Sequence, residues 1–79
     1  MRSVSILLDS VDKIKSFVYD ISRFRTDFDI ISGRYCVDAK SIMGIFSLDL
    51  SKPLSLEIHC DESDPEYPEI QEVLKKYTA

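Results

Sequence analysis

Lys40-Ser41-Ile42-Met43-Gly44-Ile45-Phe46-Ser47-Leu48 is a stretch in which a serine precedes an unusually apolar run. Serine is a preferred N-cap residue, so we predict that a short helix begins at Ser41 and continues to Leu48. At that position the hydroxyl would lie beside free backbone N–H groups and the positive end of the helix dipole, which favour an oxygen or a phosphate. Ser41 is therefore interpreted as a plain cap or as an acceptor of phosphate.

The apolar residues after Ser41 are too many for a short helix with one buried stripe. They are Ile42, Met43, Ile45, Phe46 and Leu48. We expect some of them to face solvent and to form a surface for a partner protein. The alternative is that a small domain buries most of them and leaves the rest exposed without a role.

The residues before this stretch predict a strand followed by a helix. Ser3 to Leu8 has the composition of a short strand. The next apolar residues recur at helical spacing, which predicts a helix from Val11 to Phe24. They are Val11, Ile14, Phe17, Val18, Ile21 and Phe24. Ser10 is the expected N-cap of this helix, and Asp12 suits its positive first turn.

Three further segments complete the pattern. Asp27 to Ile31 and Tyr35 to Val37 flank a turn that contains Gly33, which predicts a β-hairpin. Apolar and polar residues alternate from Leu54 to Cys60, as in a strand with one buried face. The polar, proline-containing stretch from Asp61 to Pro68 predicts a connection, and residues 69–77 predict a last helix with Ile70, Val73, Leu74 and Tyr77 on its buried face.

This order of elements predicts an α+β fold in which three helices cover one face of a four-stranded, mostly antiparallel sheet. The 79 residues suffice for one domain, residues 1–79, with one core. A net charge of −4 without a basic cluster argues against binding to nucleic acid or to an anionic membrane. The chain shows no signal peptide and no membrane-spanning run, so we expect a cytoplasmic protein whose partners are other proteins.

The residues most often used in catalysis and metal binding form no pattern in this sequence. His59 is the single histidine, and strand alternation places it on the solvent side, where we expect it to be structural and without partners. Cys36 and Cys60 lack ligand spacing, so we expect each to be a reduced, small buried side chain. We therefore predict no enzyme activity, no metal site and no cofactor.

The stretch Val37 to Leu48 resembles the regulatory-serine helix of HPr, the phosphocarrier family of the bacterial phosphoenolpyruvate-dependent sugar phosphotransferase system. The predicted order and lengths of the elements are similar to those of HPr along essentially the whole chain. The resemblance implies the HPr-like open-faced sandwich fold. It also implies that Ser41 corresponds to the family's regulatory serine.

The same ungapped alignment, anchored on Val18 to Phe24, shows a loss at the other family site. HPr proteins carry their phosphoryl group on a histidine within a His-Ala/Thr-Arg-Pro motif at the start of the first helix. Ser10 corresponds to that histidine, Asp12 to the arginine and Lys13 to the proline. We interpret Ser10 as a helix cap, because no neighbouring base is evident to activate it. We predict that the protein does not relay phosphate through histidine.

The resemblance further implies that Ile42, Met43 and Phe46 form an exposed docking patch, while Ile45 and Leu48 turn inward. It predicts a regulatory protein that an HPr-type kinase phosphorylates on Ser41. Its expected partners are that kinase, components of the phosphotransferase system or a transcriptional regulator. The alternative is a diverged interaction module of the same fold, with no phosphorylation and no role in sugar uptake.

Overall fold

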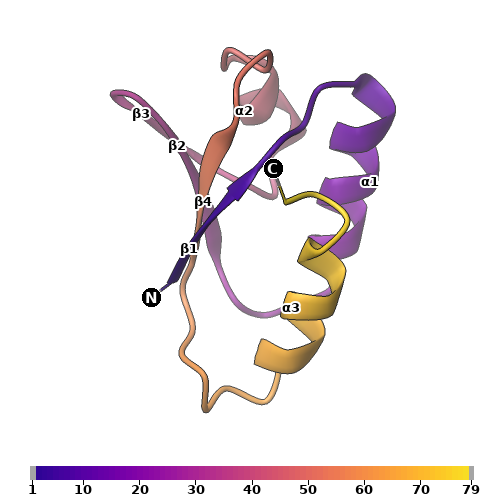
Figure 1. Ribbon diagram of the computed structural model, residues 1–79, viewed down its shortest axis with the longest axis vertical. Coiled ribbons are helices and arrows are strands. Elements are labelled where there is room, and N and C mark those ends of the chain that lie inside the picture. Colours follow the sequence, from indigo (N-terminus) through magenta and orange to yellow (C-terminus); the bar gives the residue numbers. More distant parts are fainter. Residues whose placement is uncertain (1, 79) are drawn as a thin grey trace.

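A four-stranded sheet and three helices make up the structure, a computed structural model that describes residues 2–78 (Figure 1). The strands have the spatial order β1-β4-β2-β3, and each neighbouring pair is antiparallel. In chain order the elements are β1 (Arg2–Ile6), α1 (Val11–Ser22), β2 (Phe28–Ser32), β3 (Tyr35–Asp38), α2 (Ile42–Phe46), β4 (Leu54–Ile58) and α3 (Tyr67–Leu74). The predicted fold class is confirmed.

Strand β4 shows how alternation in the sequence creates the two faces of the sheet. Leu54, Leu56 and Ile58 are buried, whereas Ser55 is exposed and Glu57 is half-buried on the other face. Because successive strand residues point to opposite faces, the three apolar side chains lie on the face that the helices cover. The predicted strand ran to Cys60, and β4 ends two residues earlier, at Ile58.

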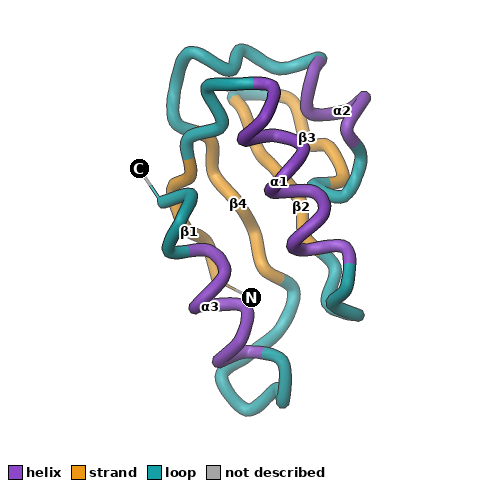
Figure 2. The backbone as a smooth tube through the Cα atoms, turned by 90° about the vertical axis from the view of Figure 1, so that its right-hand side faces the viewer, coloured by secondary structure: helices purple, strands orange, loops and turns teal. Residues whose placement is uncertain are grey.

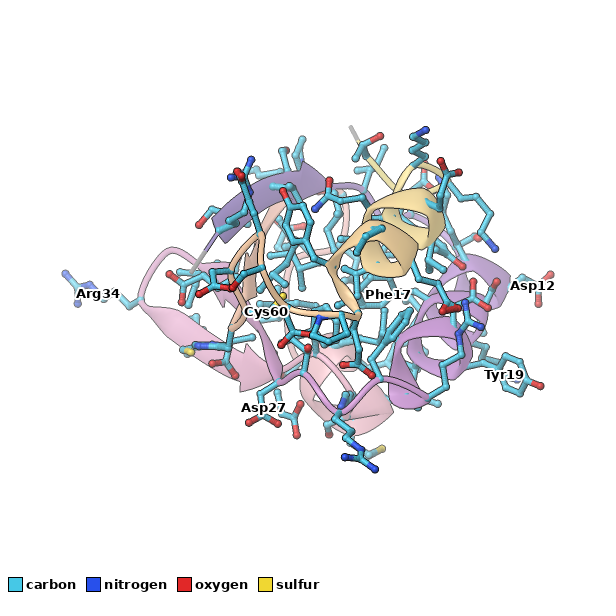
Figure 3. All side chains as sticks on the ribbon, turned by 90° about the horizontal axis from the view of Figure 1, so that it is seen from below. Asp12, Phe17, Tyr19, Asp27, Arg34 and Cys60 are labelled. Carbon is cyan, nitrogen blue, oxygen red and sulfur yellow. The ribbon has the colours of Figure 1, made fainter. Side chains whose placement is uncertain are left out.

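The helices lie on one side of the sheet and leave its other face open (Figures 1 and 2). Helix α1 buries Ile14, Phe17, Val18 and Ile21, as its spacing predicted. The ring of Phe17 meets that of Tyr77 edge-on, with centroids 5.2 Å apart. Figure 3, a view from below, shows Phe17 directed into the space between helices and sheet. These contacts fix α1 and the C-terminal segment against one common core.

Several predicted elements are too long, and their ends need correction. The first helix ends at Ser22, because the chain turns there and the amide of Phe24 bonds to the carbonyl oxygen of Ile21 (3.1 Å). Helix α2 ends at Phe46, although Leu48 beyond it is buried. Strand β1 ends at Ile6 and not at Leu8. In each case a buried side chain lies in the connecting segment that follows the element, namely Phe24, Leu48 and Leu8.

The last helix begins earlier than predicted and also ends earlier. It spans Tyr67–Leu74, with Pro68 in its first turn. Proline is tolerated there because the first N–H groups of a helix have no partner within the helix. After the helix, a turn returns the chain to the sheet, where Thr78 forms a bridge to Ile6. No helix within residues 2–78 has the length and apolar character needed to cross a membrane.

Candidate functional site

Ser41 caps helix α2, as its sequence position predicted. Its backbone is extended, and its Oγ accepts a hydrogen bond from the backbone N–H of Gly44 (3.1 Å). Gly44 also lets the helix approach the sheet closely. A Cβ atom at this position would lie 3.2 Å from the Cβ of Val37, which is closer than an ordinary contact, and 3.4 Å from the Ser41 Oγ. The cap and the glycine together position the half-buried Ser41 hydroxyl beside β3.

The outer face of α2, which we call the α2 face, consists of Ile42, Met43 and Phe46. Met43 is 81% exposed, Phe46 43% and Ile42 37%. Ile45 is completely buried, and Leu48 is 9% exposed in the turn that follows. The predicted division of this stretch into exposed and inward side chains is therefore confirmed.

The charged groups next to α2 are mostly engaged in local contacts. The ammonium of Lys40 donates a hydrogen bond to the carbonyl oxygen of Phe24 (2.7 Å). Asp38, before the helix, accepts a hydrogen bond from the backbone N–H of Lys40 (2.9 Å). Asp49, after the helix, accepts hydrogen bonds from the hydroxyl and backbone N–H of Ser51, and these bonds lower the pKa of Asp49. The apolar α2 face thus has a carboxylate in the chain segment at each end.

Ser10 is the N-cap of α1, with the same local geometry as Ser41. Its Oγ accepts a hydrogen bond from the backbone N–H of Lys13 (3.1 Å). The ammonium of Lys13 lies 3.4 Å from a carboxylate oxygen of Asp9. Asp12 points away from the protein (Figure 3). The start of α1 therefore presents a capped hydroxyl among exposed charges.

The sheet separates the sole histidine from Ser10. Strands β1 and β4 run antiparallel, with Arg2 opposite Ile58 and Ile6 opposite Leu54. His59 follows one end of this pair and Ser10 follows the other, so they lie at opposite ends of the sheet, as predicted. An imidazole cannot reach the Ser10 hydroxyl in this arrangement.

His59 is exposed, as predicted, but the expectation that it has no partners is wrong. Its Nε2 lies 2.8 Å from a carboxylate oxygen of Asp29. A ring nitrogen of His59 and one carboxylate oxygen each of Asp29 and Glu57 lie within 4.8 Å of one another. Glu57 lies in β4 and His59 follows that strand, whereas Asp29 lies in β2, so only the register of β2 against β4 brings Asp29 to the other two. This group is the feature that reasoning from sequence missed.

The two cysteines differ in their surroundings. Cys60 is buried, as predicted, and Cys36 is exposed, so the expectation of a buried side chain at Cys36 is wrong. Cys36 lies on edge strand β3, opposite Ile31 of β2. Both thiols are free. Val11, the first of the apolar residues at helical spacing, is 51% exposed, because α1 begins there, ahead of its first buried residue, Ile14.

Comparison with known proteins identifies the family of this chain. The family model described as the PTS HPr component phosphorylation site matches residues 12–76, and the chain therefore belongs to the HPr family. Ser41 lies inside the matched range, and Ser10 lies before it. Among curated proteins no sequence matches the chain.

Two solved structures of HPr proteins are similar to this chain. HPr-C-His from Thermoanaerobacter tengcongensis is 26% identical, with a TM-score of 0.75, over 96% of this chain and 89% of that protein. The phosphocarrier protein HPr from Bacillus anthracis str. Ames is also 26% identical, with a TM-score of 0.69, over 99% of this chain and 94% of that protein. The fold is thus that of the HPr phosphocarriers of the phosphotransferase system.

Proposed function

We propose that this protein is a regulatory member of the HPr family that docks partner proteins through the α2 face and does not relay phosphate through histidine. The observation that carries the proposal is the exposure of Met43, at 81%, beside two further apolar side chains on one short helix. A cluster of exposed apolar residues of this kind is typical of a protein interaction site. As in the family, the protein acts as a partner of enzymes and does not itself catalyse a reaction.

The start of α1 supports the loss of phosphate relay. Relay through histidine requires a neutral, nucleophilic imidazole nitrogen, which forms a high-energy phosphoramidate. Ser10 supplies a hydroxyl that already accepts a hydrogen bond from the backbone. Asp12 would repel the phosphate oxygens that an arginine would bind, and Lys13 already pairs with Asp9. A serine ester at Ser10 would not replace the relay.

Ser41 is the proposed regulatory site. Its hydroxyl is half-buried and lies directly before the α2 face. A phosphate there would add nearly two negative charges, which the amides of the first turn of α2 favour. Lys40 before the helix and Lys52, whose ammonium lies 3.9 Å from the Asp49 carboxylate, balance the charges of Asp38 and Asp49, so a phosphate would dominate the charge beside the α2 face. Phosphorylation would therefore strengthen contact with a basic partner surface and weaken contact with an acidic one. We place this regulation in the cytoplasm, with an HPr-type kinase, components of the phosphotransferase system or a transcriptional regulator as partners.

Incubation with ATP and an HPr-type kinase, followed by mass spectrometry, tests the regulatory site. We expect one phosphate on Ser41, the same modification in Ser10→Ala, and no modification in Ser41→Ala. Phosphate that persists in Ser41→Ala would contradict the assignment. Complete absence of phosphate would favour the alternative, an interaction module of the same fold without regulation by this kinase.

A second reaction tests the loss of relay. With phosphoenolpyruvate and the enzyme that phosphorylates HPr proteins, we expect no acid-labile phosphate on this chain. An HPr protein that carries the active histidine serves as the positive control. Acid-labile phosphate that disappears in His59→Gln would show that the sole histidine carries phosphate after all, and would overturn this part of the proposal.

A further inference from the structure

The open face of the sheet carries a group of polar side chains that has no role in the proposed docking. Glu57 of β4 lies opposite Asp29 of β2, and Asp29 lies opposite Asp38 of β3. His59 follows β4 directly, and its backbone N–H donates to the carbonyl oxygen of Asp27 (3.0 Å). The helices cover the other face (Figure 1). The fold thus gathers carboxylates and the only imidazole from three neighbouring strands.

The ligand atoms of this group are already close together. Those of Asp29, Glu57 and His59 lie within 4.8 Å of one another, and His59 Nε2 is 2.8 Å from the Asp29 carboxylate. The side chains of Asp29 and His59 are about one third exposed, at 35% and 32%, so an ion can reach them from solvent. They border a concavity of about 310 Å³ that Asp27, Phe28 and Asp38 also line.

An imidazole with two carboxylates is a donor set that suits zinc and similar transition ions. Such ions bind imidazole nitrogen and carboxylate oxygen at about 2.0–2.2 Å, so neighbouring ligand atoms of a tetrahedral site lie roughly 3.4 Å apart. The His59–Asp29 pair, at 2.8 Å, would need to open by less than about 1 Å, and Glu57, within 4.8 Å of both, would need to approach by at most about 1.4 Å. We propose that Asp29, Glu57 and His59 bind a divalent transition-metal ion of the zinc class, with water completing the coordination.

The charge around this site favours a cation. Asp29 forms an ion pair only with His59 among residues 2–78, and Glu57 forms none with any residue in that range. The excess negative charge extends to the neighbouring thiol. Partial desolvation, together with the charges of Asp29 and Glu57, raises the pKa of Cys36. A divalent ion would neutralise the two carboxylates at the point where they meet the imidazole.

Because His59 is the only histidine, its ring nitrogens report on this site alone. Tag-free protein labelled with ¹⁵N is titrated with Zn²⁺, and the imidazole nitrogen shifts are followed by NMR. We expect a saturable change at one equivalent of Zn²⁺. Asp29→Asn and Glu57→Gln should each weaken binding about tenfold or more, since loss of even an outer-shell partner commonly costs 10–100-fold. Glu72→Gln, at an exposed carboxylate of α3 that pairs with Lys75, is the matched control and should bind like the unmodified protein.

Three results would overturn the proposal. The first is a ring spectrum that Zn²⁺ does not change. The second is equal affinity in Glu57→Gln and the unmodified protein, which would reduce the group to a simple His59–Asp29 ion pair. The third is equal response to Mg²⁺, which prefers oxygen ligands and would indicate only an acidic surface. The backbone amide spectrum of each variant shows whether it remains folded. Zinc bound at the thiols alone would leave the His59 ring unchanged and so falls under the first result.

Discussion

The starts of α1 and α2 share one local structure and differ in what surrounds it. Ser10 and Ser41 each accept a hydrogen bond at 3.1 Å from the backbone N–H three residues later. Helix α1 then continues for 12 residues and buries four apolar side chains. Helix α2 has 5 residues and buries only Ile45. The same cap thus begins a helix that the core stabilises and another that exposes most of its apolar surface.

This difference separates stability from function in the two helices. The apolar side chains of α1 are used to hold the fold together, and few remain for a partner. Those of α2 remain accessible, so α2 contributes less to the fold and offers more to a docking protein. A serine at the start of a helix therefore does not by itself identify a docking site. The exposure of the apolar residues that follow it does.

The largest expected effect comes from truncating one phenylalanine in each helix. Phe17 is fully buried in α1, and Phe46 of α2 is 43% exposed. Phe17→Ala should lower the free energy of unfolding by about 3–5 kcal/mol, because it leaves a cavity in the core. Phe46→Ala should lower it by about 1 kcal/mol or less, because the site can fill with water. Urea denaturation monitored by circular dichroism measures both.

Phe46→Ala, which should have little effect on stability, should have a clear effect on binding to a partner protein. Phe46→Ala should weaken binding to the kinase. Tyr35→Ala, which removes a side chain 71% exposed at the hairpin of β2 and β3, should not. If Phe46→Ala cost as much stability as Phe17→Ala, the α2 face would be part of the core, and the comparison of the two helices would fail.

Removing each cap should have a smaller effect. Ser10→Ala and Ser41→Ala should each cost about 1 kcal/mol, because one backbone N–H loses its partner. In Ser41→Ala the loss of stability should be confined to opening of α2, because Ile45 is the one buried residue that holds this helix to the core. Hydrogen exchange of the Ile45 amide, which bonds to the Ser41 carbonyl oxygen at 3.1 Å, should accelerate about fivefold in Ser41→Ala.

The equivalent amide in α1 provides the control for this measurement. The N–H of Ile14 bonds to the carbonyl oxygen of Ser10 at 3.0 Å, and Ile14 itself is 1% exposed. Its exchange should change in Ser10→Ala only as far as global stability changes. If exchange accelerated equally at both amides, the number of buried side chains in each helix would not determine how strongly the helix depends on its cap.

Much of the fold follows from apolar periodicity, and the errors have one physical cause. The alternation of Leu54, Leu56 and Ile58 predicts β4 because strand geometry places every second side chain on the core. The spacing of apolar residues indicates which side chains are buried, however, and does not show where the helical backbone ends. Phe24, Leu48 and Tyr77 are buried beyond the ends of their helices, so each predicted helix was too long.

The candidate sites were predictable where local sequence determines them. The caps at Ser10 and Ser41 depend on neighbouring residues only. The excess of apolar residues after Ser41 predicted that some would be exposed, and the resemblance to HPr implied that Met43 is one of them. The contact of His59 with Asp29 depends on which strands pair and in which register, and a single sequence does not determine this. The exposure of Cys36 has the same origin, because β3 is an edge strand.

The smallest expected effect lies at the other end of α1, where a distant side chain accepts hydrogen bonds from the turn after the helix. The carboxylate of Glu66 accepts hydrogen bonds from the backbone N–H groups of Arg25 and Thr26 at 3.0 Å, and from the Thr26 hydroxyl at 2.9 Å. The bond from Arg25, followed by those from Thr26, lowers the pKa of Glu66 below its ordinary value although partial burial opposes the shift. The ionised carboxylate is therefore favoured in the folded state.

A lowered pKa in the folded state fixes the direction of the pH effect. The stabilisation is complete above the pKa that Glu66 has in the unfolded chain, near 4.5, and it is lost as the pH falls through the lower folded value. Glu66→Gln should be less stable than the unmodified protein at pH 7, and the two stabilities should converge as the pH falls through the lowered pKa of Glu66. Urea denaturation from pH 7 to pH 3 measures the free energy of unfolding of both proteins. If the difference between them stays constant over this range, the charge of Glu66 does not contribute to stability. The turn after α1 would then depend, like the caps of α1 and α2, on neutral hydrogen bonds alone.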